Sequence, residues 1–394
     1  MGLSMFNRVS NAVIAPNLVS DLNLDVKSLG MLGGAFFYSF ALLQIPMGIL
    51  LDRIGPRLVI PVFTLFGASG AFIFAGSHTL AIALLGRVLI GAGMSCVLMG
   101  SLKVFVLRFS PKQFATISGT FISVGMLGSI LATSPLAYAT ITIGWRMAFV
   151  CIGTIMATFA CLAFWILKGG QGQEKSAPLS PNPDQDIALS KVVKLVLGNL
   201  SFWQIGALSF FAYGSFLTLL GLWLGPYLIQ IKGFSAVQAG NILMMLPIGV
   251  ISGAPVAGHL ADRVFRSAKM AALCGLGIYT LFLIPLTGML EIETPAFYSV
   301  LFFIIGFFSS FVVLCFSHVK ELFPLSISAT VIAGINFFAM VSSAILMPVL
   351  GKVIEIFTVQ GGSDASQAYH LAFFICFIGM VASLIFYAFS KRRK

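Results

Sequence analysis

Three cationic side chains lie inside long apolar stretches of the sequence and have no acidic neighbour there. They are Arg8, Arg87 and Lys103; the acidic residues fall in loops or at helix ends, and only Glu321 comes close to an apolar stretch. A buried cation has to lose its proton, reach water or meet an anion, and a guanidinium group hardly ever loses its proton. An anionic substrate would supply the missing partner.

Arg8 is the strongest candidate for binding that anion. Thirteen residues separate it from Asp21, and this is about 20 Å of helix, which places Arg8 near the middle of a bilayer. A planar guanidinium group can donate two parallel hydrogen bonds to a carboxylate or a phosphate. The alternative is that Arg8 extends towards the membrane surface from a first helix that lacks its beginning.

The other polar candidates each have a structural alternative. Lys103 is a candidate for coupling or ligand contact. The alternative is that its ammonium group reaches the membrane surface, because it lies five residues from Arg108, about 7 Å along a helix. Arg87 either bonds to backbone carbonyls of a neighbouring helix or takes part in coupling, and His318 and Glu321 are the groups suited to carry a proton. Further substrate-binding candidates are neutral side chains of a kind that is also common in helix packing: Gln44, Tyr213, His318 and Asn336.

The amino-acid composition indicates that the candidate residues lie on membrane-spanning helices. Hydrophobic residues make up 59% of the 394 positions and the mean hydropathy is +1.03, more than a soluble core of this size needs. Because a bilayer offers the backbone no hydrogen-bond partners, apolar runs of about 20 residues must be helices. We therefore predict an all-α membrane protein with twelve spanning helices, the first of them short, at 3–19, 29–51, 58–77, 80–107, 114–138, 147–168, 201–224, 237–257, 270–290, 295–317, 326–350 and 367–390.

Positive charges in the loops predict the orientation. If the loops after even-numbered spans face the cytoplasm, sixteen Lys and Arg residues lie on that side, against four on the other, namely Lys27, Arg146, Lys232 and Lys352. This bias places both termini in the cytoplasm. It also accounts for most of the net charge of +11, so we expect no nucleic-acid partner.

A polar linker and a repeated motif divide the chain into two halves. Residues 169–193 are rich in Pro, Ser and Gly, which predicts a six-helix bundle at 1–168, a cytoplasmic linker at 169–197 and a second six-helix bundle at 198–394. GILLDRIGPR at 48–57 follows the second span of the first half, and GHLADRVFRSAK at 258–269 follows the second span of the other. Such a parallel repeat is typical of transporters built from two halves.

These motifs resemble those of the major facilitator superfamily. The family's loop signature Gly-x-Leu-x-Asp-Arg-x-Gly-x-Arg is matched by Gly48, Leu50, Asp52, Arg53, Gly55 and Arg57, and its motif Arg-x-x-x-Gly-x-Gly by Arg87, Gly91 and Gly93. The resemblance implies a twelve-helix secondary transporter that works by alternating access. It also implies a latch that closes the cytoplasmic side, with the candidates Gly48, Asp52, Arg53, Gly55, Arg57, Asp262 and Arg263. The alternative is that these residues are only topology anchors and a tight turn.

Within that superfamily, spans 1 and 10 resemble the organophosphate:phosphate antiporters. RVSNAVIAPNL places Arg8 eight residues before Pro16, as in that branch, where this arginine binds the substrate phosphate, and SHVKELFP contains His318, Glu321 and Pro324. The second arginine that those antiporters carry on helix 7 is missing from FAYGSFLTLLGLW, which favours a monovalent anion over a doubly charged phosphate ester. We predict a transporter of a small organic anion, a carboxylate or a phosphate ester. The alternatives are proton-coupled transport of a neutral or zwitterionic nutrient and a transporter-like ligand sensor.

Enzymatic and metal chemistry are not expected. The sequence offers no constellation of nucleophile, metal ligands or paired carboxylates that predicts an enzyme, so we expect no cofactor and no metal. All six cysteines fall in apolar spans, at spacings that suit neither disulfides nor a zinc site. We expect a monomer in a bacterial cytoplasmic membrane, whose partners are the lipid bilayer and the small-molecule substrate.

Overall fold

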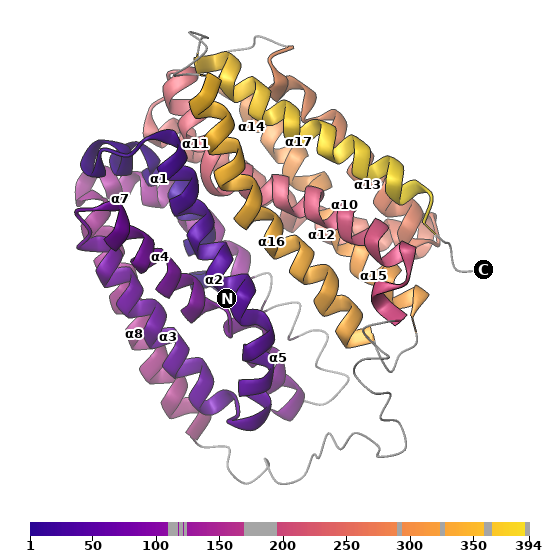
Figure 1. Ribbon diagram of the computed structural model, residues 1–394, viewed down its shortest axis with the longest axis horizontal. Coiled ribbons are helices and arrows are strands. Elements are labelled where there is room, and N and C mark those ends of the chain that lie inside the picture. The colour runs from indigo at the N-terminus through magenta and orange to yellow at the C-terminus, as the bar shows by residue number, and fades with distance from the viewer. Residues whose placement is uncertain are drawn as a thin grey trace. The chain divides into compact units, whose positions relative to one another are not determined.

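The computed structural model describes residues 1–108, 117, 121, 124–168, 195–289, 294–323, 328–357 and 365–390, and the regular secondary structure in these ranges is helical throughout (Figure 1). The predicted all-α fold is confirmed. The helices before the predicted linker are α1 (Gly2–Leu22), α2 (Val26–Arg53), α3 (Pro56–Ala75), α4 (Leu80–Met94), α5 (Val97–Arg108), α7 (Ser134–Thr142) and α8 (Gly144–Lys168).

The helices after the predicted linker are less regular. They are α10 (Leu200–Thr218), α11 (Leu224–Pro226), α12 (Ala236–His259), α13 (Ala268–Leu281), α14 (Pro295–Ser309), α15 (Val313–Leu322), α16 (Ser328–Glu355) and α17 (Ala365–Ala388). Three π-helices, η2 (Leu219–Trp223), η3 (Tyr227–Ile231) and η4 (Leu260–Val264), and two 3₁₀-helices, η5 (Ile284–Thr287) and η6 (Ser310–Val312), extend or connect them. The seventh helix therefore continues to Ile231, beyond the predicted end at residue 224.

Most described helices are long and apolar enough to cross a membrane. Ten segments of the described chain meet that criterion, or eleven if 124–131 and α7, which meet at an angle of 40°, form one span. Every predicted span contains a described helix. α1 is not among the ten, because Asn7, Arg8 and Asn11 lower its mean hydropathy, so its crossing of the membrane stays a prediction.

The local sequence explains where α2 and α3 begin. The Asp25 carboxylate accepts a hydrogen bond from the backbone N–H of Ser28 at 2.7 Å, which satisfies one of the free donors in the first turn of α2. Gly55 has φ +89° and directly precedes Pro56, the first residue of α3. Glycine adopts this backbone conformation without strain, and proline fits the first helical position because it has no N–H to satisfy.

The chain forms two compact units. Unit 1 comprises Met1–Pro178, Leu220–Met244 and Met347–Lys352; unit 2 comprises Leu179–Leu219, Met245–Leu346 and Val353–Lys394. Part of the seventh helix and a short piece of α16 thus belong to unit 1, although they follow the predicted linker. The division into 1–168, 169–197 and 198–394 stays a prediction.

Unit 1 is built around close helix packing. α3 packs against α4 and α8, and α4 also packs against α2 (Figure 1). A Cβ atom on Gly70 of α3 would lie 2.7 Å from the carbonyl oxygen of Gly86 in α4. Small residues allow such close approach of helix backbones in membrane proteins. This packing holds α4 against α2, on which the candidate site depends.

Candidate functional site: the buried cations of unit 1

Arg8 is buried in unit 1 and lies against an aromatic ring. Only 3% of its surface is exposed, and its guanidinium carbon is 4.6 Å from the ring centroid of Phe40 in α2. The backbone next to it is closely packed, since a Cβ atom on Gly221 of η2 would lie 2.8 Å from the Arg8 carbonyl oxygen. The structure therefore places Arg8 inside the unit, and its role as a binding residue near the middle of a span stays a prediction.

Arg87 of α4 is a second buried arginine of unit 1, and it contacts both α1 and α2. It is fully buried, and its Nη2 donates a hydrogen bond to the backbone oxygen of Asn7 at 3.0 Å. Its guanidinium carbon is 5.5 Å from the ring centroid of Phe36 and 5.6 Å from that of Phe74. Its Nε and Nη1 have no hydrogen-bond acceptor among the described residues. The guanidinium group thus keeps unused donors in an apolar environment.

Two asparagines complete this group of polar side chains. Asn7 donates from Nδ2 to the carbonyl of Leu3 at 2.8 Å, while its Oδ1 has no partner in the described structure. Both side-chain polar atoms of Asn11 are also buried without a partner there. Our sequence reasoning missed the two asparagines, although their spacing of four residues around Arg8 was a usable signal.

Gln44 lies on the same side of α2 as Phe40, one helical turn further on. It is buried, and its Oε1 has no hydrogen-bond partner among the described residues. Residues four apart on a helix are neighbours on its surface. Gln44 therefore lies one turn from the ring that Arg8 contacts, and its role as a ligand stays a prediction.

Lys103 has a different environment. Its Nζ donates to the carbonyl of Leu51 at 2.7 Å, in the last turn of α2. The last carbonyls of a helix have no partner within it, and a cation there is favourable. This contact fits a structural role, and a role in coupling stays a prediction.

The remaining substrate and coupling candidates lie in unit 2. His318 of α15 is fully buried, and its Nδ1 lies 2.8 Å from the Tyr387 hydroxyl of α17. Tyr213 and Asn336 are half-buried on α10 and α16, and Glu321 is exposed. Of these candidates only His318 is fully buried in the described part of unit 2, and the roles of all four in binding or coupling stay predictions.

The latch candidates lie near the ends of their helices. Arg53 is exposed at the last residue of α2, and Asp262 and Arg263 are exposed in η4. The guanidinium carbon of Arg57 is 5.8 Å from the ring centroid of Phe164 in α8. Gly48 has open space around its Cα and Gly55 supplies the turn before α3. Asp52 belongs to α2, but its side chain lies outside the described structure.

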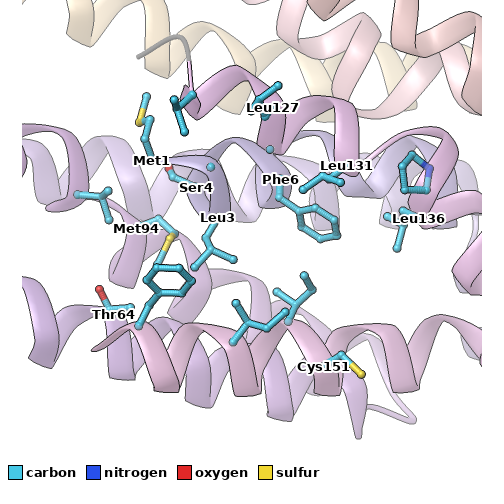
Figure 2. Close-up of a pocket in the computed structure, with 18 of the residues that line it drawn as sticks. Met1, Leu3, Ser4, Phe6, Thr64, Met94, Leu127, Leu131, Leu136 and Cys151 are labelled. Carbon is cyan, nitrogen blue, oxygen red and sulfur yellow. The ribbon is translucent and has the colours of Figure 1, made fainter. Parts of the chain in front are cut away.

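A pocket in unit 1 is apolar and is not lined by Arg8. It has a volume of about 770 Å³. Figure 2 shows Leu3 and Phe6 of α1 and Met94 of α4 at this space. The lining includes the hydroxyl groups of Ser4, Thr64 and Ser101 but no charged side chain. Because a bound carboxylate or phosphate is best compensated by a cationic side chain, this mostly apolar pocket fits the predicted substrate poorly.

Metal ligation has no support in the described ranges. No group of three or more His, Cys, Asp or Glu residues among them is placed to hold a metal ion.

The family model and the relatives found by comparison with known proteins agree with one another. The family model described as Major Facilitator Superfamily matches residues 1–347. The uncharacterized transporter YybO of Bacillus subtilis is 25% identical over 67% of this chain and 63% of its own length, so this chain spans a little under two thirds of that relative. The probable sulfoacetate transporter SauU of Cupriavidus necator is 24% identical over 72% of this chain and 69% of its own. The D-galactonate transporter of Escherichia coli is 25% identical over 70% of this chain and 69% of its own.

Solved structures share the fold at low identity. A bacterial homolog of the human lysosomal transporter Spinster, in an inward-facing and occupied conformation, has a TM-score of 0.77 at 16% identity, covering 100% of this chain and 95% of that one. A D-xylose–proton symporter has a TM-score of 0.72 at 15% identity, covering 100% and 96%.

Proposed function

Because the chain belongs to the Major Facilitator Superfamily, we propose that it is a secondary active transporter that moves a small organic anion across the membrane by alternating access. The family and the compared proteins are transporters and not enzymes. One observation carries the choice of an anion: Arg8 and Arg87 lie buried in one region of unit 1. A bound anion would compensate a charge that is otherwise costly in a membrane protein.

The names of several relatives support this substrate class. They are a probable sulfoacetate transporter, hexuronate and D-galactonate transporters and a probable hexose phosphate transport protein. All of these compounds carry a carboxylate, sulfonate or phosphate group. Because α10 has no charged residue, we favour a monovalent acid over a doubly charged phosphate ester.

Within this proposal, Arg8 is the principal ligand of the anion and Gln44 a neighbouring hydrogen-bonding group. Tyr213, His318 and Asn336 are proposed as further, neutral substrate-binding residues. Further proposals are the latch role of the two loops around Asp52 and Asp262, a coupling role for Glu321, a cytoplasmic location of both termini in a bacterial inner membrane, and a monomeric state.

A ligand-induced thermal shift tests the proposal. The protein, purified in detergent, is melted with D-galactonate, D-glucuronate, sulfoacetate, glucose 6-phosphate and neutral galactose. A ligand at 100 times its Kd stabilises the folded state by about 2.7 kcal/mol. We expect one acid to raise the Tm of the wild type and of the control Arg266→Gln, which removes an exposed charge, but not of Arg8→Gln.

Counterflow of the same acid in liposomes then separates transport from sensing. Exchange of labelled for unlabelled acid supports a transporter, whereas binding without exchange supports a ligand sensor. If only galactose shifts the Tm, or if the shift by an acid survives Arg8→Gln, the anion proposal is wrong.

A further inference from the structure

We propose that Arg87 is a positioning residue that fixes the orientation of Arg8 towards the substrate anion. This inference rests on the proposed function. Two contacts connect the arginines: the hydrogen bond from Arg87 to the Asn7 carbonyl, which immediately precedes Arg8 in α1, and a pair of stacked phenyl rings in α2.

The rings of Phe36 and Phe40 form the second connection. Their centroids are 5.8 Å apart and their planes differ by 21°. The guanidinium carbon of Arg87 is 5.5 Å from the Phe36 centroid, and that of Arg8 is 4.6 Å from the Phe40 centroid. The order is therefore arginine, ring, ring, arginine. Cation–π contacts hold a planar guanidinium group over a ring face, so this array restrains the direction of both head groups.

The hydrogen bond to Asn7 is not needed to complete α1. In the middle of an α-helix, the carbonyl of residue 7 already accepts from the N–H of residue 11. The bond from Arg87 is an additional one. A rigid guanidinium fork placed on this carbonyl fixes the height and rotation of α1 relative to α4 at the residue next to Arg8.

Burying Arg87 at a helix interface also costs folding free energy. It is fully buried, its Nε and Nη1 have no acceptor in the described structure, and no described carboxylate oxygen lies within 4.0 Å of it. A buried charge without an ionic partner opposes folding, and an apolar side chain of similar length would avoid that cost. A contribution to folding stability therefore does not explain why an arginine occupies position 87. Orienting Arg8 for substrate binding does.

This reasoning predicts opposite effects on stability and on affinity. Arg87→Met keeps the length of the side chain but removes the charge and the donor. We expect its Tm without ligand to be equal to or higher than that of the wild type. We expect the apparent KM for the most effective of D-galactonate, D-glucuronate and sulfoacetate to rise about tenfold or more, with the maximal rate nearly unchanged, because the lost contact serves binding.

Arg146 provides the matched control in the same unit. Its guanidinium group donates to the carbonyls of Ala75 and Ser77 and lies 3.6 Å from the Asp21 carboxylate. These contacts serve helix ends and a surface ion pair. Arg146→Met should therefore lower the Tm and leave the KM unchanged, which is the reverse of the pattern expected for Arg87→Met.

Arg87→Lys keeps the test informative if the methionine variant does not fold. A lysine retains the charge but not the planar fork, so the KM should lie between those of the wild type and Arg87→Met. Phe36→Leu interrupts the ring stack while both arginines remain, and should also raise the KM by severalfold.

The outcomes separate this inference from the proposed function. If Arg8→Gln abolishes binding of the acid while Arg87→Met only lowers the Tm and leaves the KM unchanged, Arg87 is a structural brace and the inference is wrong. If neither substitution affects binding of the acid, the proposed function itself is wrong.

Discussion

In each unit of this protein, a buried cation donates hydrogen bonds to the backbone carbonyls of another helix. The two cations differ in whether those carbonyls lie inside the helix or at its end. In unit 1, Arg87 bonds to a carbonyl in the interior of α1. In unit 2, Lys269 of α13 donates from Nζ to the carbonyl of Ala388 at 2.7 Å and to that of Ser390, at the end of α17. The last carbonyls of a helix need an external donor, whereas an interior carbonyl already has one.

The difference separates a cation that completes a fold from one that serves a site. Lys269 satisfies carbonyls that have no partner within the helix, and its charge is favourable at the C-terminal end of a helix dipole. Arg87 adds to a turn that is already complete and keeps two unused donors. We therefore expect stability to depend on the lysine and substrate affinity on the arginine.

The largest expected effect is that of Lys269→Met. Hydrogen bonds to charged groups contribute about 1.5–3 kcal/mol each, and leaving the two carbonyls at the end of α17 unpaired adds to the loss. Part of this is offset because the charge is no longer buried, so we expect unfolding to become easier by about 3 kcal/mol. Denaturation of the purified protein in mixed micelles measures this. Lys352→Met, which changes an exposed lysine of α16, should stay within about 0.5 kcal/mol of the wild type.

A loss of stability as small as that of the Lys352 control would contradict the comparison. It would mean that water or the α17 backbone can satisfy the carbonyls of Ala388 and Ser390 without the lysine.

Gly225→Ala tests a second contact of α1, its close backbone approach to α11. A Cβ atom on Gly225 would lie 1.8 Å from the carbonyl oxygen of Ala12, so α1 or α11 must move. Overpacking of this kind costs about 1–3 kcal/mol, and we expect about 2 kcal/mol in the same assay. Gly277→Ala in α13 has open space and should stabilise the protein by up to about 1 kcal/mol, because alanine has the higher helix propensity. Equal effects of the two substitutions would show that α1 is not held by this backbone contact.

The sequence predicted the helices well because a bilayer permits little else. Its failures have local causes. The predicted seventh helix ends at residue 224, directly before Gly225 and Pro226. In the structure two π-helical turns carry the helix through this point, and in membranes such turns can compensate for the missing proline N–H.

The chemistry of the site was only partly readable from the sequence. Arg8 and Arg87 stand out because charge is rare in apolar spans. Their connection could not be predicted, because the contact with the Asn7 carbonyl and the stack of Phe36 on Phe40 depend on how α1, α2 and α4 are rotated and crossed. Without knowledge of which helices are neighbours, a pattern of residues cannot place two guanidinium groups at the ends of one pair of rings.

Lys103→Met tests whether a lysine at a helix end in unit 1 behaves like Lys269 in unit 2. Its Nζ bonds to the Leu51 carbonyl near the end of α2, so it should behave like Lys269 and not like Arg87. We expect a loss of about 1.5 kcal/mol in unfolding free energy, from one charge-assisted hydrogen bond, and an unchanged KM for the transported acid. A raised KM with unchanged stability would instead support the coupling role that the sequence suggested for Lys103.

The smallest expected effect concerns an anion at the opposite kind of helix end. Asp25 caps the N-terminus of α2, and its hydrogen bonds with Ser28 lower the pKa of its carboxyl group. Because the pKa is lower in the folded than in the unfolded state, this stabilisation is present above the unfolded value of about 3.9 and is lost as the pH falls through the folded value. The group is exposed and water competes for it, so Asp25→Asn, itself a good cap, should change the Tm little at pH 7. Between pH 5 and pH 3 the wild type should lose slightly more stability than this variant. If the two Tm curves remain parallel over that range, the charge of Asp25 contributes nothing, and the benefit of charge at helix ends is confined to the buried lysines.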